Sequence, residues 1–116
     1  MDFRERNVLI LIASKPFGKI FAAEGWRAAV GMFGMDHSAQ MLFVGDGVYG
    51  LLNDQDTVPI RMFKSTFESF DGRICVSKKS LDEKKITPEE IFDEVEVLDE
   101  GDVAKAFVEN DVVITF

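Results

Sequence analysis

A continuous apolar run near the start of the chain constrains the fold more than any other feature of the sequence. The segment Asn7–Ala13 reads Asn-Val-Leu-Ile-Leu-Ile-Ala and has no polar residue after Asn7. Successive strand residues point to opposite faces, so an unbroken apolar run needs cover on both faces, as in a central strand of a parallel sheet. The run is far shorter than the roughly 20 residues that cross a bilayer, so we expect no membrane span. It predicts a buried strand between two layers of helices.

Helical and strand patterns alternate along the rest of the chain. Apolar residues spaced by three and four predict helices, and short apolar runs predict further strands. The helices are expected at about Lys19–Met35, at Ile60–Phe70, and through Val103–Val108. The strands are expected at Met41–Val44, Arg73–Val76, Val95–Leu98 and Asp111–Phe116. This alternation predicts a three-layer α/β/α fold with a five-stranded, mostly parallel sheet, in one domain that spans residues 1–116.

Local signals mark three boundaries within this pattern. Asp71-Gly72 follows the second helix and predicts its end. Thr87-Pro88-Glu89-Glu90 places a hydroxyl at a cap, proline at the first helical position and glutamate three residues after the cap, so a short helix is expected to start there. Glu94 and Glu96 alternate with apolar residues, which predicts that the fourth strand lies at an edge of the sheet.

Charge and composition limit the partners of the chain. Thirteen Lys and Arg against 21 Asp and Glu give a net charge of -8, which leaves no wide basic surface, so no direct nucleic-acid partner is expected. The single cysteine cannot form an internal disulfide and no signal segment precedes the first strand, which favours a cytoplasmic protein. The eleven phenylalanines exceed what a core of this size needs, so some are expected at a subunit interface.

A glycine-rich segment after the second strand matches a dinucleotide-binding pattern only superficially. Gly45-Asp46-Gly47-Val48-Tyr49-Gly50 fits G-x-G-x-x-G, but that fingerprint belongs to the first strand-to-helix turn, and Asp46 would repel a pyrophosphate. After the first strand stands Ser14-Lys15-Pro16 instead of a flavodoxin-type phosphate loop. We therefore expect the glycines to serve a tight turn, and we expect no nucleotide or other cofactor.

Cys75 is the strongest candidate nucleophile in the sequence. We expect it near the carboxyl end of the third strand, where ligands of doubly wound sheets bind. Lys78 and Lys79 follow in a segment expected to be helical through Lys85. Their charges and the helix amides would favour the thiolate, and the position at the strand end would leave the sulfur partly exposed. The alternative is a buried cysteine that acts as a small apolar side chain. The only histidine, His37, has no partner at metal-ligand spacing and is expected in a loop at the opposite end of the strands, so no metal site is predicted.

Several segments, taken in order, resemble the DsrE/DsrF-like sulfur-relay family and are most similar to its DsrF/TusC branch. They are Lys15-Pro16-Phe17-Gly18, Glu24-Gly25, Asp46-Gly47-Val48, Leu51-Leu52 and Asp111–Phe116. Ile74-Cys75-Val76 resembles the start of the segment that carries the active cysteine in the DsrE branch. Alignment on Ser80-Leu81 instead puts Ser77 at a cysteine position of the TusC-like branch.

The resemblance implies small α/β subunits that assemble as trimers or hexamers and pass persulfide sulfur between cysteines, as in tRNA thiolation or sulfur oxidation. Two roles follow for this chain. It is either a carrier, in which the Cys75 thiolate takes the outer sulfur of a donor persulfide and releases it to an acceptor thiol, or a partner subunit of a sulfurtransferase complex. The implied partners are copies of itself or similar small subunits, together with sulfur donor and acceptor proteins. The alternative function is a non-catalytic structural or regulatory oligomer with a buried cysteine.

Overall fold

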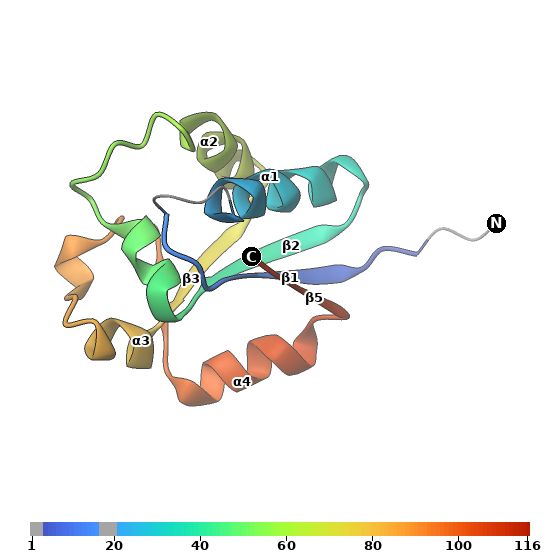
Figure 1. Cartoon of the computed structure of the whole chain (residues 1–116). Coiled ribbons are helices and arrows are strands. Elements are labelled where there is room, and N and C mark those ends of the chain that lie inside the picture. Colours follow the sequence, from blue (N-terminus) through green and yellow to red (C-terminus); the bar gives the residue numbers. More distant parts are fainter. Residues whose placement is uncertain (1–3, 17–20) are drawn as a thin grey trace.

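Five parallel strands form one twisted sheet with helices on both of its faces (Figure 1). The computed structural model describes residues 4–16 and 21–116. The strands are β1 (Asn7–Ile12), β2 (Ser38–Phe43), β3 (Arg73–Ser77), β4 (Glu96–Leu98) and β5 (Val112–Thr115). The α-helices are α1 (Phe21–Gly34), α2 (Arg61–Ser69), α3 (Lys78–Glu83) and α4 (Glu100–Glu109), and two 3₁₀ helices are η1 (Gly45–Leu51) and η2 (Pro88–Glu90). The predicted three-layer α/β/α fold is confirmed, and the sheet is wholly rather than mostly parallel.

The strand order β4-β3-β2-β1-β5 explains why the helices divide between the two faces. The chain adds β2, β3 and β4 in one direction from β1, and α1 and α2 lie together on one face. It then returns to the other side of β1 through α4. Since crossovers between parallel strands are right-handed, this reversal puts α4 on the opposite face. The predicted edge position of the fourth strand is confirmed, and the other edge is β5.

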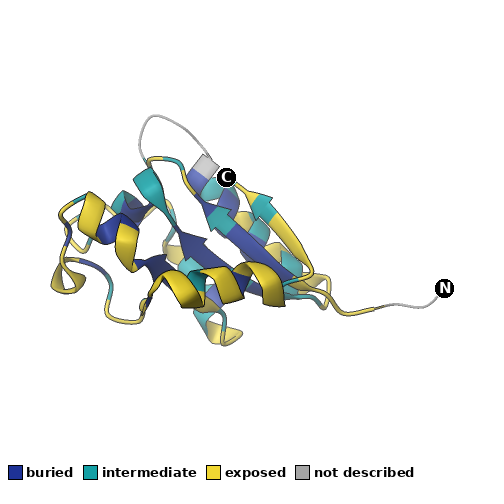
Figure 2. Ribbon diagram, turned by 90° about the horizontal axis from the view of Figure 1, so that it is seen from below, coloured by how far each residue is buried: buried dark blue, intermediate teal, exposed yellow. Residues whose placement is uncertain are grey.

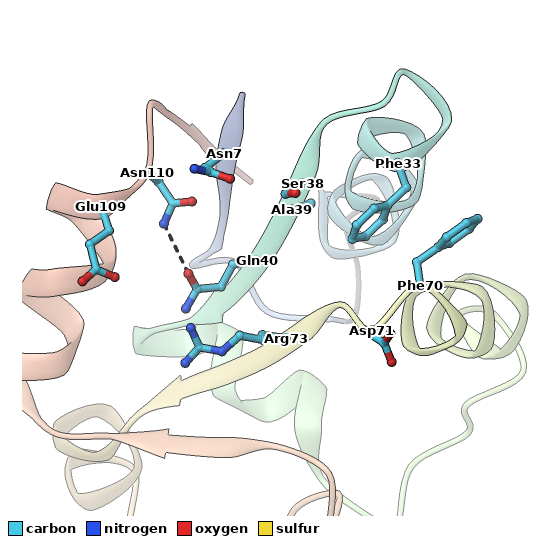
Figure 3. A pocket seen from close by; sticks show the side chains of 10 residues that line it. All are labelled: Asn7, Phe33, Ser38, Ala39, Gln40, Phe70, Asp71, Arg73, Glu109 and Asn110. Carbon is cyan, nitrogen blue, oxygen red and sulfur yellow. Dashed lines mark hydrogen bonds between the residues drawn. The ribbon is translucent and has the colours of Figure 1, made fainter. Parts of the chain in front are cut away.

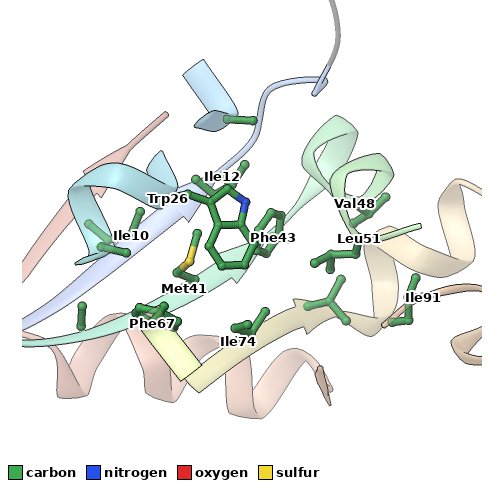
Figure 4. Close-up of a cluster of buried hydrophobic side chains, with 14 of the residues drawn as sticks. Ile10, Ile12, Trp26, Met41, Phe43, Val48, Leu51, Phe67, Ile74 and Ile91 are labelled. Atoms are coloured by element: carbon green, nitrogen blue, oxygen red, sulfur yellow. The ribbon is translucent and has the colours of Figure 1, made fainter. Parts of the chain in front are cut away.

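The main core lies between the sheet and the layer of α1 and α2 (Figure 4). Trp26 of α1 is buried beside Phe43 of β2 and meets Phe67 of α2 edge to face, with ring centroids 6.2 Å apart. The view coloured by burial shows the central strands of the sheet mostly buried and the outer helix surfaces exposed (Figure 2). None of the described helices has the length and apolar character needed to cross a bilayer.

Two of the differences from the predicted elements concern β2 and the glycine-rich segment. β2 begins at Ser38 rather than Met41, because Ser38, Ala39 and Gln40 pair with β1 although the run is not apolar. The predicted tight turn at Gly45–Gly50 is the 3₁₀ helix η1, in which Gly45 has a φ of 53°. Phe17, Gly18 and the predicted helix start at Lys19 lie outside the described residues.

The predicted capping box is present, whereas Asp71 and not Gly72 has the left-handed conformation after α2. The Glu90 carboxylate accepts hydrogen bonds from the backbone N–H and the hydroxyl of Thr87, so the predicted capping box starts η2. After α2, the left-handed conformation is at Asp71, with a φ of 60°, and not at Gly72. A Cβ on Gly72 would lie 2.5 Å from the ring of Phe67, so that glycine is needed for packing.

Candidate functional site

Cys75 lies within β3, two residues before the strand ends, and its side chain points to the α4 face of the sheet. It is 0% exposed and packs in a small cluster with Leu9, Leu42, Leu98 and Ala106. The prediction of a partly exposed sulfur near the carboxyl end is therefore wrong. The reason is that β3 continues through Ser77, which pairs with β4 and moves the turn into α3 beyond the cysteine.

Polar side chains also lie near the Cys75 sulfur, in addition to the apolar cluster. Gln40 Nε2 donates a hydrogen bond to Cys75 Sγ over 3.4 Å, and Glu96 Oε2 lies 4.0 Å from the sulfur. Burial raises the pKa of the Cys75 thiol, and the Glu96 carboxylate raises it further, against the lowering effects of Gln40 and Arg73. This direction is opposite to the predicted lowered pKa and favours the protonated thiol over the thiolate.

The two candidate thiolate-stabilising lysines belong to α3 and face other partners. Lys78 Nζ lies 3.5 Å from an Asp82 carboxylate oxygen, and Lys79 Nζ lies 3.7 Å from one of Glu100. Both lysines are exposed. The cation that acts on the pKa of Cys75 is Arg73. The structure therefore does not bring the lysines together with the thiol.

A groove lined by polar and aromatic side chains lies over the start of β2 and β3 (Figure 3). Two adjoining cavities of about 320 and 420 Å³ share Gln40, Arg73 and Glu109 as lining residues. Asn110, at the end of α4, donates to Gln40 Oε1 over 3.2 Å and to the Ala106 carbonyl over 2.7 Å. Cys75 is thus separated from the groove by side chains that hydrogen bonds hold in place.

Arg73 and Glu96 form the half-exposed part of this cover. Arg73 Nε and Nη2 donate to the two carboxylate oxygens of Glu96 over 2.9 and 3.1 Å. The hydrogen bond from Arg73 lowers the pKa of Glu96. Because the folded-state pKa is lowered, the pair stabilises the fold above the ordinary pKa of a glutamate, and this contribution disappears as the pH falls through the lowered value.

Gln40, Glu96 and Asn110 were not identified from the sequence. Gln40 lies in β2, Glu96 lies in β4, and Asn110 directly follows α4. A glutamine just before an apolar strand is the only local signal at Gln40. Their convergence depends on strand order, which no local pattern contains.

The carboxyl end of β3, where the thiol was expected, holds Ser77. The Ser77 side chain is the N-cap of α3 and accepts from the Ser80 N–H over 3.2 Å. The Ser80 hydroxyl in turn accepts from the Gly45 N–H over 3.0 Å, which ties α3 to the start of η1. At this corner the two serines satisfy backbone donors.

Residues of the glycine-rich segment contact other parts of the protein. Asp46 pairs with Lys84 at 2.9 Å, and this hydrogen bond lowers the pKa of the Asp46 carboxyl. A Cβ on Gly47 would lie 2.1 Å from the carbonyl oxygen of Ile12, so Gly47 serves close backbone approach and not a positive φ. These contacts leave η1 packed against β1 and α3.

We expect no saturable heat when NAD or FMN is titrated into the protein at micromolar concentration in a calorimeter. The Asp46 carboxylate lies within the glycine-rich segment, and its charge opposes a phosphate. Asp46→Asn serves as the matched variant, because it removes the charge and keeps the shape. Saturable binding of either cofactor to the wild-type protein would contradict this interpretation of η1.

His37 lies just before β2 at the amino end of the sheet, as predicted, and its Nδ1 accepts from the Arg6 N–H over 3.0 Å. Across residues 4–16 and 21–116, no three His, Cys, Asp or Glu side chains gather in a way that could hold a metal ion.

Comparison with known proteins gives matches over nearly the whole chain. The model of the DsrE/DsrF-like family matches residues 6–116. The chain is 30% identical to the intracellular sulfur oxidation protein DsrF of Allochromatium vinosum, and the match covers 96% of each chain. It is also 30% identical to a TusC homolog of Vibrio vulnificus, over 77% of this chain and 80% of that one.

Two solved structures share the fold. The ychN protein of E. coli aligns with a TM-score of 0.80 over 97% of this chain and 100% of its own, at 18% identity. A protein of unknown function from Methanobacterium thermoautotrophicum aligns with a TM-score of 0.69 at 14% identity, with the same coverage. At these identities the likeness concerns the fold alone.

Proposed function

The chain belongs to the DsrE/DsrF-like family, and from this premise we propose that it is a partner subunit of a sulfur-relay complex and not the persulfide carrier itself. The resemblance found in the sequence is confirmed by the family match and by the DsrF and TusC relatives. The proposed complex is a sulfurtransferase assembly inside the cell, in which similar small subunits supply the reactive cysteine.

The burial of Cys75 is the observation that carries this proposal. A persulfide carrier must present a thiolate to two successive partner proteins, because the thiolate is the nucleophile that takes the sulfur and the carrier persulfide must then be reached by an acceptor thiol. Cys75 is 0% exposed, and burial and Glu96 raise its pKa. Both properties oppose a carrier role in this conformation.

The carrier role of Cys75 is the second candidate function, and the polar cover of the thiol favours it. Arg73 and Glu96 are half exposed, and such surface ion pairs contribute only about 0–1 kcal/mol. If the Arg73–Glu96 ion pair opened, the sulfur would be accessible from the groove. The binding of a sulfur donor protein would supply the free energy needed to open it. The structural or regulatory oligomer differs from the partner subunit only in having no sulfur-carrying neighbour.

Treatment of the folded protein with a persulfide donor distinguishes these functions. We expect no adduct at Cys75 and slow alkylation of the native thiol, because the sulfur is buried and its raised pKa favours the protonated thiol. In denaturant the same thiol should alkylate to completion, which serves as the internal control. Intact-protein mass spectrometry measures both.

The carrier role would be supported by a gain of one sulfur atom on the native protein that Cys75→Ser abolishes. The partner role makes a second demand, namely co-purification with a similar small subunit that does accept sulfur. Co-expression with proteins encoded beside this chain tests it. If the chain binds none of them, the structural or regulatory function is favoured.

A further inference from the structure

The groove over the start of β2 and β3 combines an exposed aromatic ring with carboxylates that form no ion pair among the described residues. We infer that this groove binds a segment of a partner protein that carries arginine side chains. The inference names the chemistry of that partner and rests on the proposed role of the chain as a partner subunit.

The aromatic part of the groove is the stacked pair of Phe33, near the end of α1, and Phe70, directly after α2 (Figure 3). The two ring centroids lie 5.2 Å apart, and the ring planes differ by 14°. Phe33 covers one face of Phe70, yet Phe70 is 53% exposed. An exposed phenyl ring attracts cations, and the planar guanidinium of arginine stacks on it better than an ammonium does.

Three exposed carboxylates line the same groove. Asp71 and Glu109 line its first cavity, and Asp102 and Glu109 line its second. Within residues 4–16 and 21–116, none of the three forms an ion pair. Asp71 follows Phe70 in the chain, so an aromatic ring and a carboxylate lie next to each other at this end of the groove.

The charges that line the groove favour a cationic occupant. Arg73 donates two hydrogen bonds to Glu96, so these two charges offset each other. The three unpaired carboxylates then face one further cation, Lys105. The net charge of -8 on the whole chain adds to the attraction.

Arginine matches both parts of the groove. Its guanidinium donates two parallel hydrogen bonds to a carboxylate and also stacks on an aromatic ring, whereas lysine offers a point charge. An acidic segment would have to displace Glu96 from Arg73 and would be repelled by the other carboxylates. A purely apolar segment would remove those carboxylates from water without pairing them, which is unfavourable.

Fluorescence anisotropy with labelled peptides tests the inference on the wild-type protein. The probe is a six-residue peptide of alternating glycine and arginine, and two matched peptides carry lysine or glutamate in place of arginine. We expect the arginine peptide to bind about fivefold more tightly than the lysine peptide, and the glutamate peptide not to bind. Equal affinity for arginine and lysine peptides would overturn the inference, because attraction to the net charge alone would then explain the binding.

Two substitutions in the groove test where the arginine peptide binds. Glu109→Gln removes an unpaired carboxylate and Phe70→Ala removes the aromatic ring, and each should weaken binding by about threefold. Glu83→Gln on α3 and Met62→Ala on α2 make the same changes of side-chain type at exposed positions outside the groove, and both should leave the affinity unchanged. Wild-type affinity of both groove variants would contradict the inference.

Nuclear magnetic resonance of the wild-type protein provides a measurement that does not depend on the folding of a variant. Titration with the arginine peptide should shift the amide signals of Phe70, Asp71 and Glu109 and leave those of Met62 and Glu83 in place. Shifts confined to other parts of the chain would overturn the inference. The proposed function would be unaffected by that result, because it is tested by sulfur transfer and co-purification, which these peptides do not measure.

Discussion

Replacing Gly47 with alanine is expected to destabilise the protein by about 3 kcal/mol or more, a large share of the 5–15 kcal/mol by which domains of this size are stable. The added Cβ would lie 2.1 Å from the Ile12 carbonyl oxygen and 2.8 Å from its carbon. Both are backbone atoms of β1, so they cannot move aside as a flexible side chain would. The free energy of unfolding, obtained from urea titrations followed by circular dichroism, measures the effect.

Gly31→Ala is the matched control for this substitution. Gly31 lies in α1, and a Cβ there would meet nothing within 4 Å. The alanine is therefore expected to stabilise the protein by about 0.5–1 kcal/mol, because glycine is entropically unfavourable within a helix. If the two variants had equal stability, close packing of η1 against β1 could not be the reason for glycine at position 47.

Replacing Glu96 with alanine is expected to increase the alkylation rate of Cys75 at neutral pH by about tenfold for each unit by which the thiol pKa falls. The substitution removes a carboxylate that raises this pKa and leaves Arg73, which lowers it, without its partner. It also removes part of the side-chain cover of the sulfur. The rate of iodoacetamide modification, followed by mass spectrometry across a pH series, measures both effects, and its midpoint should move to lower pH.

Glu100→Ala is the control for charge alone. Glu100 is an exposed carboxylate on α4 that pairs with Lys79 and is not among the groups that act on Cys75. It should leave the alkylation profile unchanged. If Glu96→Ala also left it unchanged at equal stability, then the cluster of Leu9, Leu42, Leu98 and Ala106 would be what protects the thiol, and the carrier role would lose its support.

The carrier and partner functions therefore differ in one measurable property, which is how readily the cover over Cys75 opens. Gln40, Arg73 and Glu96 form that cover from three adjacent strands. A partner protein that binds the groove would compete for the same hydrogen bonds. If Cys75 became reactive only in the presence of a second subunit, the chain would act both as a partner subunit and as a carrier in the same complex.

The features encoded in short segments could be predicted from the sequence. The apolar run at Asn7–Ala13 predicted a strand buried on both faces, and the alternation of helical and strand patterns of apolar residues predicted the α/β/α layers. The capping box at Thr87–Glu90 formed where it was predicted, because its hydrogen bonds join residues three apart. Helical periodicity likewise predicted α2 within one residue at each end.

The burial and the pKa of Cys75 could not be predicted from the sequence, because they depend on tertiary contacts. Its burial depends on how far β3 extends and on which strands lie beside it, and its pKa depends on Gln40 and Glu96, which are 35 and 21 residues away in sequence. Lys78 and Lys79 follow Cys75 closely in sequence, but they belong to α3 and pair with other carboxylates. Side-chain environment in a parallel sheet is set by strand order and register, and both arise from crossover connections that no local pattern records.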